Sequence, residues 1–402
     1  MIKIVHINAT DARGGAAIAM KRHSEAMNRA GFDSRIVVAN HPSLYEKILQ
    51  SLFFRINHWR VEKLQAKANF SLMNFGLPLY KKRIVRDADI IFLHWLCENT
   101  LSIDGVEQIL KLGKPTFWYM HDMFPFTGGC HYSLECNRYT HDCKNCPQIG
   151  CAFKKNMAAK QLAEKIEHWS KYSNLEFIAP STWESKCAEK STLCRGHKVH
   201  VVANILDTDI YKPLDIDAKV CLGLDPNKRT ILFGATRIGS PYKGSVYARE
   251  CLSMLDPKKY EGLVLGKADK DFISGLPIKV VQTGFLTKDE DIALAYNACD
   301  TFLMTSIAES FGQVVAEAMA CGKPCVGFPT GGVTDLIRHK ESGFLTTDYY
   351  PKELKEGITW LFEDKERYGK LSYEARRQIV KGNSFMNVLD IHSELNFFKK
   401  KK

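Results

Sequence analysis

Short, nearly continuous apolar segments recur along the whole chain, and amphipathic segments of helical length lie between many of them. An apolar run without alternation is typical of a strand that is covered on both faces, as in a parallel sheet. The expected strands are residues 2–7, 35–39, 89–94, 115–120, 175–179, 199–203, 230–235, 262–266, 278–282, 300–304 and 324–328. The expected helices include 16–30, 158–172, 289–298 and 314–321. Strands that alternate with helices predict an α/β protein with doubly wound, parallel sheets.

The chain has 402 residues, which is enough for two or three domains with cores of their own. Residues 204–228 contain Pro213 and Pro226 and show little hydrophobic periodicity, as expected of a connection between two domains. We predict an N-terminal Rossmann-like domain over 1–203, a C-terminal Rossmann-like domain over 204–384, and a helix and tail over 385–402 that packs back on the N-terminal domain.

Charge and hydropathy indicate which partners the chain can bind and in which compartment we expect it. The net charge of +11 suits anionic partners such as nucleotide phosphates or an anionic lipid surface, and no recognised nucleic-acid-binding motif is found. The N-terminus carries no secretory leader, and no apolar run approaches the ~20 residues of a membrane span. We therefore expect a cytoplasmic protein whose thirteen cysteines are mostly reduced.

Two glutamates eight residues apart, Glu309 and Glu317, lie in the segment 309–332. Glu309 follows an expected strand, Ser310–Gly312 form a turn, and Glu317 falls within the next helix. A helix N-terminus offers free N–H groups and a positive dipole end, so it can bind a diphosphate. A carboxylate in the first helical turns can accept hydrogen bonds from ribose hydroxyls. The alternative is a surface helix with ordinary acidic residues near its start.

A second segment, 234–244, follows the strand at 230–235 and carries Arg237 and Lys243 on a loop with glycine and proline. Arginine makes planar, bidentate contacts to phosphate, and lysine provides a point charge. Together they can neutralise a departing diphosphate. The alternative is a pair of unrelated surface cations.

Together the two segments resemble the large GT4 family of retaining glycosyltransferases, which have the GT-B fold of two Rossmann-like domains facing a cleft. The resemblance covers the organisation of the whole chain, and it is most specific at 234–244 and 309–332, where a small-residue helix and a GKPCVGF strand follow the glutamates. It implies that Arg237 and Lys243 bind the donor diphosphate, that Glu309 lies by the transferred sugar and that Glu317 holds the ribose. The turn residues Ser310, Phe311 and Gly312 belong to the same implied donor site.

The N-terminal half agrees with the resemblance, which implies that Gly14 and Gly15 of the loop TDARGGAA approach the donor phosphates. It also implies that His121, which precedes Asp122 after an expected strand, lies near the transferred sugar. From the residues alone, the glycines could equally form a tight turn, and His121 could be structural. The loop has neither a G-x-G-x-x-G nor a G-K-[ST] motif, which disfavours NAD-dependent oxidation and P-loop chemistry.

The activity that the resemblance implies is transfer of a hexose, with retention, from a UDP- or GDP-linked donor to a glycan or lipid-linked acceptor in surface polysaccharide assembly. No catalytic metal is expected, because no Asp-x-Asp motif lies in a suitable loop. One alternative is a non-catalytic nucleotide-sugar sensor or scaffold on the same fold, which the presence of Glu309, Arg237 and Lys243 disfavours. Another is a nucleotide-sugar epimerase, which the glycine loop and His121 fit less well.

A cysteine-rich insert occupies residues 128–151. Its four closely spaced cysteines, Cys130, Cys136, Cys143 and Cys146, could build a closed tetrahedral site for structural zinc. In a reducing compartment zinc explains the cluster better than disulfides do. Similar inserts in some GT4 members favour a structural role, and the alternative is a set of free thiols that pack a loop.

Residues 47–86 combine aromatic and aliphatic side chains with lysine and arginine at roughly helical spacing. A basic helix of this kind can lie on an anionic membrane surface, which would suit a lipid-linked acceptor and a peripheral location on the inner face of the membrane. The alternative, which we favour slightly, is two helices that pack on the N-terminal sheet with their cations in solvent.

Overall fold

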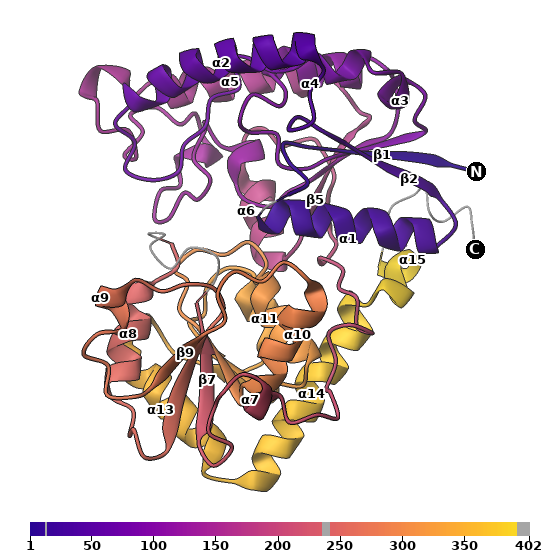
Figure 1. Cartoon of the computed structure of the whole chain (residues 1–402). Coiled ribbons are helices and arrows are strands. Elements are labelled where there is room, and N and C mark those ends of the chain that lie inside the picture. Colours follow the sequence, from indigo (N-terminus) through magenta and orange to yellow (C-terminus); the bar gives the residue numbers. More distant parts are fainter. Residues whose placement is uncertain (13, 235–241, 392–402) are drawn as a thin grey trace. The chain divides into compact units, whose positions relative to one another are not determined.

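The computed structural model describes residues 1–12, 14–234 and 242–391, and the chain divides into two compact units. The first unit comprises Met1–Ile205 together with the short helix α15 (Val388–Ile391), and the second comprises Leu206–Asn387. These divisions lie two and three residues from the predicted boundaries. Figure 1 shows an α/β body in each unit.

The first unit is built on a six-stranded parallel sheet with the strand order β2-β1-β3-β4-β5-β6. Its strands are β1 (Lys3–Asn8), β2 (Asp33–Val38), β3 (Ile90–Leu93), β4 (Thr116–Tyr119), β5 (Leu175–Ala179) and β6 (Val199–Val201). Its helices are α1 (Gly15–Arg29), α2 (Leu44–Glu62), α3 (Arg83–Arg86), α4 (Ile103–Leu110), α5 (Met157–Trp169) and α6 (Thr182–Lys190). In Figure 1, α2, α4 and α5 lie on one side of this sheet and α1 lies on the other.

The second unit repeats the plan with the parallel order β12-β11-β10-β7-β8-β9. Its strands are β7 (Arg229–Phe233), β8 (Tyr260–Val264), β9 (Val280–Gln282), β10 (Thr301–Met304), β11 (Cys325–Gly327) and β12 (Gly343–Leu345). Its helices are α7 (Ala218–Cys221), α8 (Ser245–Ser253), α9 (Lys270–Ile273), α10 (Asp289–Ala298), α11 (Gln313–Ala320), α12 (Val333–Leu336), α13 (Pro351–Phe362) and α14 (Lys365–Asn383). Helix α8 packs against α13, whereas α7, α10, α11 and α14 pack in succession.

All eleven predicted strands are present, each within two residues of its predicted ends, and so are the four predicted helices. The prediction missed β12, which has three residues and pairs only with β11 at the edge of its sheet. For residues 47–86 one of the two expectations was a pair of helices, and the structure has α2 and α3 there. Only α2 is long, and a 3₁₀ turn and the single-turn helix α3 follow it.

The core of the first unit fixes the carboxyl ends of its central strands. Trp118 is fully buried against Trp169 and Phe177, with ring centres 5.1 and 6.4 Å away. The indole Nε1 of Trp118 donates to the carbonyl of His94 at 3.0 Å, and that of Trp169 donates to the carbonyl of Ile103 at 3.1 Å. Because a buried indole N–H needs a partner, these contacts hold the backbone that follows β3.

Candidate functional site

In the second unit, an ion pair joins the two segments that the sequence analysis singled out. Lys243 lies before α8 and Glu309 lies after β10, and the lysine Nζ donates to the glutamate Oε2 at 2.8 Å. Both side chains remain partly exposed, so a ligand can reach them. Arg237, the other predicted cation, lies outside the described residues.

The backbone around Lys243 is held against the end of β10. The amide of Ile307 donates to the carbonyl of Tyr242 at 2.8 Å, and the hydroxyl of Thr305 donates to the carbonyl of Lys243 at 3.1 Å. Gly244 has a φ of +60°, and a Cβ there would lie 1.9 Å from the carbonyl oxygen of Thr305. Only glycine fits this approach. Because Gly244 directly follows Lys243, this close approach also fixes the position of the lysine backbone.

The turn before α11 leaves the start of that helix without a side-chain cap. Gly312 precedes the helix with a φ of +98°, and as a glycine it has no side chain that could cap the first helical N–H groups. Ser310 and Phe311 are buried, and the amide of Gly332 donates to the carbonyl of Glu309 at 3.0 Å. The loop is therefore fixed before any ligand arrives, with the positive end of the helix dipole beside the Lys243–Glu309 pair.

Glu317 is not on the surface of α11, as the simpler interpretation of the sequence would have it, but is 5% exposed. Its Oε2 accepts from the hydroxyl of Tyr296, on α10, at 2.9 Å. Burial, and secondarily the Glu317 charge, raise the pKa of Tyr296 well above its ordinary value. The tyrosine therefore stays a donor and orients the carboxylate. The sequence analysis did not find Tyr296, because only the packing of α10 on α11 brings it here.

The predicted glycine loop of the first unit has open space above it. Gly14 precedes α1 with a φ of +92° and, like Gly15, would carry a Cβ without meeting any described atom within 4 Å. Asn8 steadies this edge, because its Oδ1 accepts from the amide of Trp95 at 2.8 Å and its Nδ2 donates to the carbonyl of Thr10 at 2.6 Å. A ligand could thus approach the start of α1 closely.

His121 and Asp122 follow β4, and the structure gives them different surroundings. Asp122 is buried and accepts from Nδ1 of His131 at 2.6 Å, from Nε1 of Trp95 at 3.1 Å and from the amide of Phe124 at 2.9 Å. Burial alone would lower the pKa of His131, but the Asp122 carboxylate outweighs burial and raises it to about 10. His131 is therefore an imidazolium at neutral pH, and the pair is a buried ion pair.

His121 is held neutral instead. Burial lowers the pKa of His121 to about 4, although the neighbouring Asp122 acts in the opposite direction. Its Nε2 lies 2.9 Å from Nδ1 of His94, a fully buried histidine whose pKa burial also lowers well below the ordinary value.

A buried lysine braces the loop that carries Phe124. Lys165 of α5 is fully buried and donates to the carbonyls of Phe124, Pro125 and Thr127 at 2.6, 3.3 and 2.9 Å. Burial lowers its pKa to about 8. Because one ammonium group binds three carbonyls of this loop, the backbone that follows His121 and Asp122 has little conformational freedom.

The four predicted metal ligands line one small cavity in the first unit, together with Phe70 and Tyr139. Burial raises the pKa of Cys130 to about 12 and that of Cys143 to about 11, so both are thiols in the absence of a metal. Among the described residues, the groups whose ligand atoms all lie within 4.8 Å of one another do not include these cysteines. A zinc site would therefore need the sulfurs to draw closer, and zinc stays a prediction.

The sequence profile of the family described as Glycosyl transferases group 1 matches residues 273–378. This stretch contains Glu309, the turn before α11, and Glu317. Over this stretch the chain is similar to the group 1 glycosyltransferases.

Two relatives are similar to the chain over part of their length. An N-acetyl-alpha-D-glucosaminyl L-malate synthase of Bacillus anthracis is 34% identical over 95 residues, which are 24% of this chain and 25% of the relative. A D-inositol 3-phosphate glycosyltransferase of Jonesia denitrificans is 33% identical over 200 residues, which are 45% of this chain and 47% of the relative. The chain thus spans a quarter to about half of the length of these relatives.

Among solved structures, the HepE protein of Anabaena in complex with UDP-glucose is similar over 99% of this chain and 100% of its own. The TM-score is 0.65 and the sequence identity is 19%. This likeness concerns the fold, and it confirms the prediction of the two-domain GT-B fold.

Proposed function

We propose that this glycosyltransferase moves a hexose from a nucleoside diphosphate sugar to a hydroxyl of a glycan or lipid-linked acceptor, with retention at the anomeric carbon. The observation that carries the proposal is the Lys243–Glu309 pair, held by a fixed loop at the uncapped start of α11. A cation beside a helix N-terminus suits a diphosphate, which is the leaving group of such a donor.

In the proposed reaction the acceptor oxygen forms a bond to the anomeric carbon, and the bond from that carbon to the diphosphate oxygen breaks. The acceptor proton passes to the departing phosphate. Lys243, Arg237 and the start of α11 stabilise the growing negative charge, which is the largest contribution a preorganised site makes. Glu317, oriented by Tyr296, accepts from the ribose hydroxyls.

Glu309 has a second part in this proposal. In the described structure it takes the hydrogen bond of Lys243. A bound diphosphate competes for that lysine, and the carboxylate then becomes available to a hydroxyl of the transferred sugar. In the first unit, Gly14, Gly15 and His121 are proposed to contact the ligand, as the family resemblance implies.

The names of the compared proteins guide the choice of substrates. HepE was crystallised with UDP-glucose, and the Bacillus anthracis and Jonesia denitrificans proteins are named for acceptors other than a polysaccharide. UDP-linked hexoses are therefore the first donors to test, and a role in surface polysaccharide assembly is the proposed context for the acceptor.

Nucleotide binding tests the donor site directly. We expect UDP or GDP, at a hundredfold excess over its Kd, to stabilise the protein by about 2.7 kcal/mol in a thermal-shift series. Lys243→Ala and Glu317→Ala should lose most of this shift, and the exposed Lys258→Ala should keep it. If no nucleoside diphosphate shifts the wild type, the donor site is wrong. If a nucleoside diphosphate binds but no sugar is transferred to any acceptor, the result favours the non-catalytic sensor alternative.

Helix α2 carries the exposed apolar and basic face that the membrane hypothesis requires. Ile48, Leu52 and Trp59 are exposed and line a shallow groove with Lys47 and Arg55. No helix among the described residues is long and apolar enough to cross a bilayer. An apolar and basic helical face instead suits the surface of an anionic membrane, and we propose that α2 contacts one.

We expect the protein to co-sediment with vesicles that contain phosphatidylglycerol, and salt to weaken that binding. The double variant Leu52→Glu, Trp59→Glu should bind at least about tenfold more weakly. Ile216→Glu, an exposed apolar residue of the second unit, is the matched control and should bind as the wild type does. Equal sedimentation with neutral and anionic vesicles would rule out this role for α2.

Zinc at the cysteine cavity is tested by metal analysis of the purified chain. Thiolates prefer zinc, so we expect about one zinc per chain, lost in Cys143→Ser and Cys146→Ser together with thermal stability. Cys221→Ser, an exposed cysteine of the second unit, should keep the metal. A metal-free wild type with four freely titratable thiols at the cavity would leave the simpler alternative, in which the thiols only pack the loop.

A further inference from the structure

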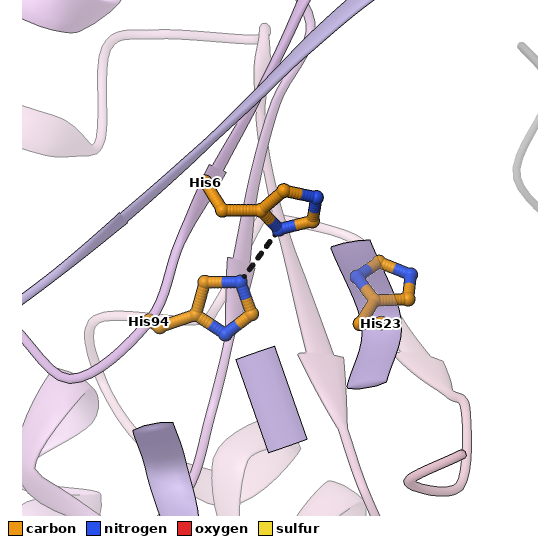
Figure 2. Close-up of side chains that lie close together, drawn as sticks. All are labelled: His6, His23 and His94. Atoms are coloured by element: carbon orange, nitrogen blue, oxygen red, sulfur yellow. Dashed lines mark hydrogen bonds between the residues drawn. The ribbon is translucent and has the colours of Figure 1, made fainter. Parts of the chain in front are cut away.

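Three histidines from three neighbouring strands form one hydrogen-bonded row in the first unit. His6 lies on β1, His94 directly follows β3 and His121 follows β4, and the sheet places these strands side by side. His6 Nδ1 lies 2.9 Å from His94 Nε2, and His94 Nδ1 lies 2.9 Å from His121 Nε2. Figure 2 shows the first of these contacts, with the ring of His23 beside it.

The row continues into the interior through two serines. His6 Nε2 lies 3.0 Å from Ser34 Oγ, and Ser34 Oγ lies 2.9 Å from Ser24 Oγ of α1. Ser24, Ser34, His6 and His94 are all buried, whereas His121 is partly exposed. The row therefore has a closed end at Ser24 and an open end at His121.

Each ring in the row shares its protons with a neighbour. A neutral imidazole has one N–H and one bare nitrogen, so each ring must donate on one side and accept on the other. Since both nitrogens of His94 face another histidine, its tautomer sets the role of His121 Nε2. The direction of the whole row is then decided at its closed end.

Ser24 decides that direction. Among the described residues its hydroxyl has one hydrogen-bond partner, Ser34. A buried hydroxyl proton without an acceptor costs more than an unused oxygen lone pair, so Ser24 donates to Ser34. Ser34 then donates to His6 Nε2, His6 donates through Nδ1 to His94, and His94 donates through Nδ1 to His121 Nε2. His121 is left with its proton on Nδ1.

We propose that Ser34, His6 and His94 are positioning residues that hold His121 in the neutral Nδ1–H tautomer, so that it presents a donor to a ligand oxygen. Among the described residues, His121 Nδ1 has no hydrogen-bond partner. The ligand atom is an acceptor, such as a sugar hydroxyl oxygen or a phosphate oxygen. The identity of that ligand rests on the proposed function, but the tautomer does not.

The same rings could be considered as a metal site, because ring nitrogens of His6, His23 and His94 lie within 4.8 Å of one another. A metal would compete with the His6–His94 hydrogen bond and would place a dication in a buried site whose three ligands carry no negative charge. The hydrogen-bonded row satisfies the nitrogens of His6 and His94 without that cost, so we favour the row.

Nitrogen-15 NMR of the full chain with labelled histidine tests the proposal without any turnover. We expect His6, His94 and His121 in the Nδ1–H form at pH 7. His94→Phe keeps a ring against Tyr119 and His121 but removes both nitrogens, so His121 should lose the single tautomer. Ser34→Ala should have the same effect on His6. His23→Phe is the matched control and should leave His121 unchanged.

Three results would overturn the proposal: an Nε2–H tautomer at His121 in the wild type, a His121 tautomer unchanged by His94→Phe, or bound metal lost in His23→Phe. If the transferase activity is established, His94→Phe should lower kcat/KM about tenfold, the worth of one hydrogen bond, with nucleotide binding unchanged. An unchanged tautomer preference with lost activity would contradict the row, whereas a changed tautomer without any transferase activity would leave it standing.

Discussion

Asp122→Asn is expected to lower the free energy of unfolding by about 3–5 kcal/mol at pH 6, because it leaves a buried imidazolium without its partner. His131 is buried and donates to Asp122 at 2.6 Å, and its other ring nitrogen lies 2.9 Å from the hydroxyl of Ser71. Asparagine keeps the shape of the side chain but removes the charge. Denaturant unfolding of the two proteins measures the difference. Asp87→Asn, which breaks an exposed ion pair with Arg83, is the control and should cost under about 1 kcal/mol.

The pH dependence of that difference has a definite sign. The folded pKa of His131, about 10, exceeds its ordinary value of 6.5, so the stabilisation is complete below pH 6.5 and declines as the pH rises to 10. The pKa of Asp122 is lowered by His131 despite burial, so its stabilisation is present above 3.8 and declines on further acidification. The gap between wild type and variant should therefore be largest between about pH 4 and 6.5. A gap that grows from pH 6.5 to 10 would refute the ion pair.

The strands could be predicted because both sheets are parallel and covered on both faces. Each central strand is then a short apolar run with a polar or glycine residue behind it, and the chain shows this directly. Strand β12 escaped because a three-residue edge strand, GFL, has too little pattern to separate it from a loop. The pattern located helix α2 but did not show that Leu52 and Trp59 are exposed. Which side of a helix faces the solvent depends on how the helix packs, and the helical pattern alone does not determine this.

The site could be predicted where its chemistry is local. Lys243 and Glu309 each follow a strand of one parallel sheet, and such residues meet at one edge. Partners that depend on strand order could not be found this way. His131 is nine residues from Asp122 through an irregular loop, and Tyr296 reaches Glu317 from another helix. His6 and His94 are 88 positions apart in the chain, and they meet only because β1 and β3 are neighbours in the sheet.

Lys243→Met is expected to lower kcat for sugar transfer by about 10²–10³-fold, the cost of removing one preorganised group that stabilises developing charge. Its stability should change little, because the Lys243–Glu309 pair is partly exposed and such pairs contribute about 0–1 kcal/mol. The fixed position of the lysine, set by the glycine after it, is what makes its charge effective. The measurement is steady-state transfer from the donor that the thermal-shift series selects.

Two further variants test whether the lost rate comes from the missing charge beside the departing diphosphate. Lys258→Met removes an exposed lysine from the same unit and should leave kcat unchanged. Lys243→Arg keeps the charge but not the compact ammonium, so it should recover part of the lost rate. A donor with a better leaving group needs less stabilisation and should narrow the gap between wild type and Lys243→Met. If Lys243→Met instead raises KM alone, the lysine binds the donor equally in the ground and transition states, and the proposed electrostatic role is wrong.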